Sequence, residues 1–352
     1  MKSLSLLALP ALLLCATAGL AQEDDQTRDH EERDRLYQQR RLQQQTRQPA
    51  HPVDDEARLA AFLGQADELI RDRNYASDSS EHYRVQTDDP RLRAATATRL
   101  LESFRTYFDG FWPESVELQP YDEVSRSFLF YSFYKFNQLL DGDFRFRTFR
   151  PKGHYGSDLD VITLHTDAGD GGALADSLIH EAAHQLVMQR LFGGGQLPAL
   201  WVNEGLAAYF GFTLADEQGA FQRAFIGGKS AVLIKGSTKD PGIERKQSLK
   251  RAKDGLRAAG KQSVGLIERI VSIDGPDEFY GNHASLNYAA SWMLVHFLLH
   301  GEDGTHATAF QRYLDLERQG RGGPAAFYET VELAPDQLEA SVAAHAKSLK
   351  AR

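Results

Sequence analysis

The sequence has little cysteine, no long apolar run beyond its first residues and no excess of basic residues. Cys15 is the single cysteine in 352 residues, so no intramolecular disulfide can form, and stability must come from the core or from bound metal. No stretch of about 18 or more apolar residues follows the N-terminal segment, so we expect no membrane anchor. With 40 Lys and Arg against 49 Asp and Glu, the formal net charge of −9 provides no basic surface for nucleic acid.

The first residues resemble a cleaved secretory signal. Lys2 supplies a positive start, residues 4–14 form an apolar run too short to cross a bilayer, and residues 19–21 (Gly-Leu-Ala) form a small-residue cleavage site. We therefore expect a secreted or periplasmic protein whose signal, residues 1–21, is removed. A lipoprotein site at Cys15 is the less favoured alternative, because a bulky leucine precedes this cysteine.

Composition divides the remaining chain into a polar tail and a globular part. Residues 22–56 are rich in Gln, Arg, Asp and Glu, which predicts a flexible tail, and whether it is a propeptide stays open. Residues 57–212 are expected to hold a small mixed sheet and two long helices, and residues 213–352 to be mostly helical. Strands in the first part of the globular region, followed by a mostly helical second part, predict an α+β fold.

Apolar periodicity predicts the individual elements. Strands are expected over residues 82–87, 126–132 and 160–166. Helices are expected over residues 57–70, 94–111, 174–192, 198–212, 248–271, 286–300, 307–318 and 335–348. Pro198 is expected in the first turn of its helix, where proline is tolerated.

Two histidines and a glutamate form the chemically most informative motif, His180-Glu181-Ala182-Ala183-His184. On a helix, positions i and i+4 lie on one face about 6 Å apart along the axis, so the two imidazoles can converge on one ion. Glu181 is rotated by about 100° around the helix, which lets its carboxylate reach a water held by the metal and act as general base. Two surface histidines on an ordinary helix would match the same positions, so the motif alone does not establish a site.

A second segment supplies a third candidate ligand. Residues 201–210 read Trp-Val-Asn-Glu-Gly-Leu-Ala-Ala-Tyr-Phe, and Glu204 follows His184 by 20 residues, enough to leave one helix and return on another. Two histidines and one glutamate are a standard ligand set for catalytic zinc, with a fourth position left for water. Imidazole and carboxylate ligands favour zinc over calcium or magnesium. We therefore predict one zinc ion per chain, held by His180, His184 and Glu204.

Together the two segments resemble the gluzincins, the clan of thermolysin and aminopeptidase N, and in particular exported bacterial peptidase-like proteins of that clan. The gluzincin pattern is H-E-x-x-H followed about twenty residues later by N-E-G-x-A-x-Y. It is matched at His180, Glu181, His184, Asn203, Glu204, Gly205, Ala207 and Tyr209. The resemblance covers roughly residues 82–314, with strong motifs only over 177–210. It implies a zincin-like fold and an exported zinc peptidase acting on a peptide or protein substrate, in which Glu181 activates a zinc-bound water.

This sequence lacks the motifs of two related groups of zinc peptidases. Metzincins would need a glycine and a histidine at the positions of Val187 and Arg190, so the spacing excludes them. Relatives of aminopeptidase N carry a Gly-x-Met-Glu-Asn segment that binds the free amine of the substrate, and nothing in residues 141–177 matches it. The resemblance therefore does not imply aminopeptidase activity, and the choice between endopeptidase and exopeptidase stays open.

The oxyanion of the reaction needs a donor besides the metal. Clan members similar to aminopeptidase N use a tyrosine that opens a downstream helix, and residues 287–298 resemble that element, which makes Tyr288 the predicted second catalytic residue. His283 and Tyr280 are alternatives, because thermolysin-like enzymes use a histidine for this task. A tyrosine in an apolar helix can also be an ordinary core aromatic. The two histidines of the helix over 286–300 are expected to pack or to cap the helix.

Three further positions have a candidate role near the metal. Asp176 could hydrogen-bond to a zinc-binding imidazole, or simply supply negative charge near the start of its helix. His154 and Tyr155 could line a substrate groove. If the strand over 160–166 is the edge strand above the zinc, an extended peptide could pair with it.

Two other functions remain as alternatives to a peptidase. The chain could be a catalytically silent binding protein with a gluzincin-like fold, although such a protein has no physical requirement for a base at Glu181. It could also be a zinc hydrolase of a non-peptide amide or ester, because the same metal chemistry permits that reaction.

Overall fold

The computed structural model describes residues 52–71, 73–140, 152–166, 174–195, 197–215, 221–222, 243–260 and 262–350. The predicted signal and the predicted tail up to residue 51 lie outside the described residues. Helix α2 (Pro52–Ile70) begins inside the last part of the predicted tail, so the globular part starts before Ala57. In the part of the chain that the structure describes, every helix is too short or too polar to cross a membrane.

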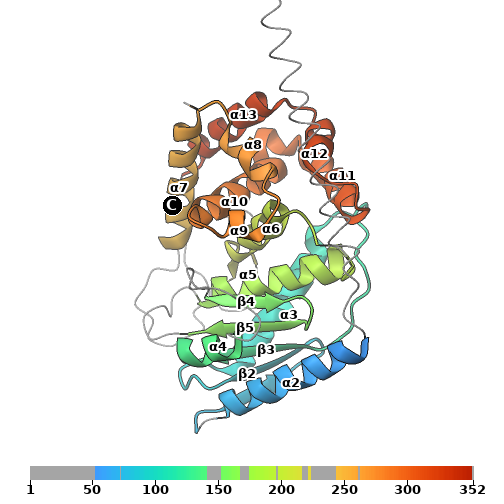
Figure 1. Cartoon of the computed structure of the whole chain (residues 1–352), viewed down its shortest axis with the longest axis vertical. Coiled ribbons are helices and arrows are strands. Elements are labelled where there is room, and N and C mark those ends of the chain that lie inside the picture. Colours follow the sequence, from blue (N-terminus) through green and yellow to red (C-terminus); the bar gives the residue numbers. More distant parts are fainter. Residues whose placement is uncertain are drawn as a thin grey trace, which may run out of the picture.

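A five-stranded mixed sheet forms one half of the molecule (Figure 1). Its strands are β1 (Ala76–Ser79), β2 (Tyr83–Thr87), β3 (Ser125–Phe130), β4 (Gly153–Gly156) and β5 (Val161–His165). The spatial order is β1-β2-β3-β5-β4, in which β2, β3 and β5 run parallel and the two outer strands run antiparallel to their neighbours. Strand β5 is therefore an interior strand. The condition under which a peptide would pair with residues 160–166, that they form the edge, is not met. The edge strand β4 was not predicted, because its two glycines and its lack of a β-branched residue give little strand signal.

Helices cover both faces of the sheet. Helix α3 (Ala94–Phe111) and α5 (Leu174–Leu186) pack on one face, and a short π-helical turn (Val187–Leu191) extends α5. Helices α2 and α4 (Phe133–Leu140) pack on the other face over a separate apolar cluster that includes Phe128, Phe130 and Phe136. Strands buried on both faces are nearly continuous apolar runs, as β5 (Val-Ile-Thr-Leu-His) is.

The second half of the molecule is mostly helical and lies on the far side of α5 from the sheet (Figure 1). It begins with α6 (Leu200–Gly211), followed by two two-residue strands, β6 (Leu214–Ala215) and β7 (Phe221–Gln222). The remaining helices are α7 (Ile243–Ala259), α8 (Leu266–Val271), α9 (Pro276–Phe279), α10 (Ala284–His300), α11 (Ala307–Arg318), α12 (Pro324–Val331) and α13 (Pro335–Ser348), with a 3-10 turn at Gly301–Gly304. The predicted α+β class is confirmed, and one apolar core runs through both halves.

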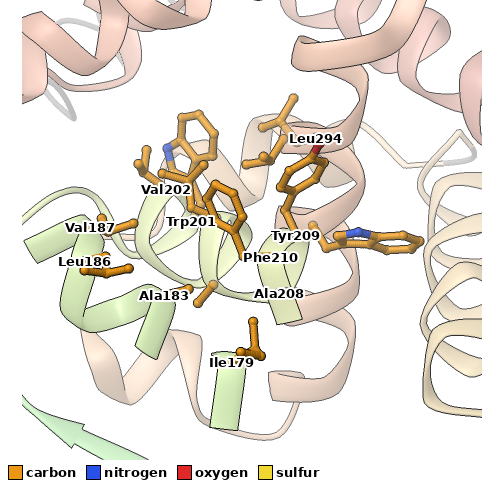
Figure 2. Packing of buried hydrophobic residues seen from close by; sticks show 14 of the residues in the cluster. Ile179, Ala183, Leu186, Val187, Trp201, Val202, Ala208, Tyr209, Phe210 and Leu294 are labelled. Carbon is orange, nitrogen blue, oxygen red and sulfur yellow. The ribbon is translucent and has the colours of Figure 1, made fainter. Parts of the chain in front are cut away.

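Helices α6 and α10 are apolar on all sides, as expected of helices at the centre of a fold. Figure 2 shows α6 residues Trp201, Val202 and Phe210 packed between α5 residues such as Ala183 and α10 residues such as Leu294. Close approach of the helices depends on a glycine. A Cβ atom on Gly205 would lie 2.8 Å from the Ser291 carbonyl oxygen and 2.7 Å from Val295 Cγ2. The glycine that follows Glu204 therefore lets α6 and α10 touch directly.

Most predicted helices are confirmed, and the differences have local causes. Helix α6 starts at Leu200, so Pro198 precedes the helix and is not in its first turn. Ala199, in an extended conformation, is the N-cap residue and donates its backbone N–H to Glu317 Oε2 at 3.0 Å. The helix predicted over 248–271 is two helices, α7 and α8, separated by the segment from Gly260 to Gly265. The elements that were not predicted are all short: β1, β4, β6, β7, α4, α9, α12 and the 3-10 turn at Gly301–Gly304.

Replacing Gly205 with alanine is expected to lower the free energy of unfolding by about 1–3 kcal/mol, because the new methyl group meets backbone that cannot move aside. Denaturant unfolding measures the change. Gly64→Ala in α2 is the matched control, because a Cβ there meets nothing within 4 Å, and it should be neutral or stabilise by up to about 1 kcal/mol. Equal effects of the two substitutions would contradict this account of the packing.

Candidate metal centre

The structure brings the three predicted ligands together. His180 and His184 lie one turn apart on α5, and their Nε2 atoms are 3.2 Å apart. Glu204, from α6, places Oε2 3.5 Å from His180 Nε2 and 3.4 Å from His184 Nε2. Among the described residues this is the one group of three or more His, Cys, Asp or Glu side chains whose ligand atoms converge within 4.8 Å.

The spacing of the three atoms fits a tetrahedral metal ion. Zinc binds histidine nitrogen and carboxylate oxygen at about 2.0–2.2 Å, and two ligands of a tetrahedral ion at that radius lie about 3.4 Å apart. The observed separations of 3.2, 3.4 and 3.5 Å are close to this value. Only small side-chain shifts would be needed to admit an ion. The donor set of two imidazoles and one carboxylate is chemically suited to zinc.

Two hydrogen bonds orient the ligands, and neither was predicted from the sequence. Asn203 Oδ1 lies 3.0 Å from His184 Nδ1, which places the proton on Nδ1 and leaves Nε2 as the ligand atom. Tyr280 donates its hydroxyl to Glu204 Oε1 at 2.5 Å, so Oε2 is the oxygen that faces the histidines. The match of Asn203 to the gluzincin pattern was the one available signal for the first contact. Tyr280, one of the alternatives for the oxyanion donor, thus has its hydroxyl on the candidate ligand Glu204.

The buried carboxylate of Glu204 controls the charge of the two imidazoles. Burial alone would raise the pKa of Glu204, but His184 and His180 outweigh it and hold that pKa well below its usual range. Burial alone would lower the pKa of His184, but the Glu204 carboxylate reverses the effect and raises it to about 9. Without a metal ion, a proton on His184 therefore compensates the buried carboxylate at neutral pH.

Glu181 lies next to the three ligands at the edge of the sheet. Its side chain is buried, and a Cβ atom on Gly153 of strand β4 would lie 2.7 Å from Glu181 Cγ and 2.8 Å from Oε1. The backbone of the edge strand thus approaches the carboxylate as closely as a glycine permits. Burial raises the pKa of Glu181, although His180 and His184 oppose the shift. A carboxyl group with a raised pKa is suited to accept and return a proton near neutral pH.

Tyr288 lies beside the candidate ligands and His283 does not contact them. The Tyr288 ring is 6.3 Å from the His180 ring, centroid to centroid, and it lines the same cavity as His180 and Glu181. Burial raises the pKa of Tyr288 far above its ordinary value, and the Glu204 carboxylate adds to the shift, so the hydroxyl stays a donor. His283 is an exposed residue that caps the start of α10 and is not among the described residues lining this cavity.

The three further positions with a candidate role near the metal, Asp176, His154 and Tyr155, make packing contacts. Asp176 lies in the first turn of α5, and its Oδ1 accepts a hydrogen bond of 2.9 Å from buried Arg245 of α7, which explains its burial. Tyr155 donates its hydroxyl to Asp160 at 2.9 Å, so it anchors the hairpin between β4 and β5 and does not line the cavity. His154 points into a small cavity with Phe62, on the α2 side of the sheet.

The histidines of α10 behave as expected. His296 Nδ1 lies 2.9 Å from His345 Nε2, and His300 Nε2 lies 2.8 Å from the Tyr209 hydroxyl. Both contacts join α10 to neighbouring helices, away from the candidate metal ligands. Tyr209, which matches the last position of the gluzincin pattern, therefore has a packing role here.

Zinc binding is expected to release roughly one proton per chain at pH 7, because the pKa of His184 is about 9 in the metal-free protein and the proton must leave before Nε2 can bind. The number should fall toward zero as the pH rises above 9, where His184 is already neutral. Titration calorimetry in buffers of different ionisation enthalpy counts the protons. No release at pH 7 would mean that His184 is neutral in the metal-free protein.

Tyr280→Phe is expected to weaken zinc binding by about 10–100-fold, because Glu204 loses the hydrogen bond that holds Oε1 away from the histidines. Tyr209→Phe is the matched control, because the hydroxyl that it removes contacts His300 of α10, and it should leave the affinity within about twofold. Competition with a chelator of known affinity measures both. An equal loss for the two variants would mean that the contact of Tyr280 with Glu204 does not determine the affinity.

Comparison of the sequence with models of known protein families finds no match, and comparison with curated proteins finds no significant match. The arrangement of His180, His184 and Glu204 around a buried Glu181 is therefore the basis for any functional assignment.

Proposed function

We propose that this chain is a zinc-dependent peptidase of the gluzincin type with a zincin-like catalytic domain. The observation that carries the proposal is the position of Glu181. A buried carboxylate lies beside three side chains spaced for a tetrahedral ion and opens on a cavity that a substrate can enter. The likeness of residues 180–184 and 203–209 to the gluzincin segments adds support. The predicted signal, residues 1–21, would direct the enzyme to the periplasm or the exterior.

The chain's own residues have distinct tasks in this reaction. His180, His184 and Glu204 would hold zinc, which polarises the attacking water and the scissile carbonyl when bound. Glu181 takes a proton from the water as its oxygen attacks the carbonyl carbon. When the C–N bond breaks, Glu181 delivers that proton to the leaving nitrogen. Tyr288 donates a hydrogen bond to the oxygen that becomes negatively charged.

Strand β4 is the element that would align a peptide. It is the outer strand of the sheet on the side of α5, and its first residue, Gly153, lies against Glu181. An extended substrate would add to the outer edge of β4, with which no other described strand pairs, and bring one peptide bond over the metal. Strand β5 cannot take this task, because it lies between β3 and β4.

Two alternatives predict different behaviour of the same protein. A silent binding protein would hold zinc and cleave nothing, and would keep its role with glutamine at position 181. A zinc hydrolase of non-peptide amides or esters would turn over small acyl compounds but leave a peptide library intact. The peptidase is favoured because the cavity borders both Glu181 and the outer strand β4.

Glu181→Gln is expected to retain near-stoichiometric zinc and to lower kcat for peptide cleavage by at least about 100-fold, because the substitution removes the proton acceptor and no ligand. Elemental analysis and cleavage of a peptide library, on this variant and on the unchanged chain, measure both quantities.

The combined outcome separates the alternatives. Zinc in both proteins without cleavage in either would replace the peptidase with a silent binding protein or a non-peptide hydrolase. Absence of bound metal in both proteins would remove the basis of all three functions.

A further inference from the structure

The cavity beside the candidate ligands, called here the metal-side cavity, has a volume of about 420 Å³. Its described walls come from the start of β4 and from helices α5, α6, α7 and α10. A volume of this size lies within the range of small-molecule sites. The metal-side cavity is therefore large enough to receive part of a substrate as well as the reacting bond.

Helix α7 faces the metal-side cavity with an arginine and neutral donors. Gln247, Ser248 and Arg251 all line it, and their spacing of three and four residues puts them on one face of the helix. Ser177 and Ser285 add hydroxyl groups from the opposing helices, and Lys152 adds an ammonium group. This is a lining rich in hydrogen-bond donors.

Arg251 differs from Arg245, Lys250 and Arg257 of α7 in having no acidic partner among the described residues. Lys250 and Arg257, on the outer side of the helix, pair with Asp254 at 2.6 and 2.9 Å. Arg251 is exposed, and none of the residues that the structure describes forms a hydrogen bond or ion pair with it. Its guanidinium is therefore available to a ligand.

The acidic residues of the metal-side cavity do not offset this arginine. Among the described lining residues the acids are Asp176 and Glu181. Asp176 is bound to buried Arg245, which also fixes α7 against α5. Glu181, together with Glu204, would balance the two charges of a divalent metal ion. Arg251 is then left without a compensating acid among the described residues that line the metal-side cavity.

We propose that the metal-side cavity recognises a carboxylate of the substrate, with Arg251 as its principal contact. An arginine fork binds a carboxylate with two parallel hydrogen bonds, which makes it more selective than an ammonium group alone. The carboxylate can belong to an acidic side chain or to the C-terminus of a peptide. This proposal names the substrate class of the peptidase proposed above and rests on it, but the binding step can be tested without any cleavage.

The test uses three small probes of nearly the same shape that differ in whether, and where, they carry a carboxylate. N-acetylglutamine carries a terminal carboxylate, N-acetylglutamic acid α-amide carries a side-chain carboxylate, and N-acetylglutamine amide is neutral. Their binding to the zinc-loaded chain is measured by titration calorimetry, and repeated on Arg251→Gln and on the matched control Arg257→Gln. We expect at least one carboxylate probe to bind more tightly than the neutral amide, and Arg251→Gln to weaken that binding by at least about tenfold. Arg257→Gln should leave it unchanged.

The outcomes distinguish this proposal from the proposed function. The carboxylate probe that depends on Arg251 identifies the source, a side chain or a terminus. Carboxylate binding that Arg251→Gln does not change would mean that the carboxylate binds the metal or another group, and would overturn the proposal. So would equal binding of the neutral amide. If no peptide is ever cleaved, the peptidase fails, whereas Arg251-dependent binding of a probe still stands as a property of this cavity.

Discussion

The buried carboxylate of Glu204 is the constraint on which the rest of the site depends. A carboxylate in a buried position is costly unless its oxygens are paired with donors or cations. Tyr280 donates to Oε1, while Oε2 faces the two imidazoles of α5. The second oxygen therefore needs a positive charge between the helices, which either a proton on His184 or a divalent ion can supply. The two states compete for the same position, so metal binding, protonation and folding are linked at this point.

That carboxylate can face α5 only because the central helices approach one another closely. Gly205, one residue after Glu204, lets the α6 backbone touch α10, and Gly211 lies where a Cβ atom would be 3.1 Å from the His180 side chain. The buried Glu317 of α11 accepts the N–H that begins α6, which sets where the helix starts and hence which residue faces the histidines. Gly153 has the corresponding role on the sheet side, where it admits Glu181. The site is thus assembled by backbone contacts at three glycines and by one buried cap.

The parts of the site that could be predicted from the sequence are those that regular geometry determines. Two histidines four residues apart must share a helix face, and a glutamate on the following helix can return to them, so His180, His184 and Glu204 were predictable as a group. Contacts between distant elements were not: Tyr280 reaches Glu204 across 76 residues, and Arg245 reaches Asp176 across 69. Strand β4 was missed because glycines are poor strand formers, and one of its two glycines, Gly153, is the residue that admits Glu181. The residues that serve the site are the ones that obscured the local structure.

Glu181 is the feature that a purely structural explanation accounts for least well. It is buried close to Glu204, whose negative charge is among the causes that raise its pKa, and a glutamine of nearly the same shape would avoid this repulsion. Groups whose pKa is shifted by both burial and a nearby like charge are typical of catalytic sites. There the loss of stability that the shift causes is offset by function. A divalent ion among His180, His184 and Glu204 would relieve that repulsion. The ionised base would then stand beside the activated water. Without metal, the two neighbouring carboxylates destabilise the fold; with metal, Glu181 can accept a proton from water. This difference favours a hydrolase over a silent binding protein, which would need only the fold.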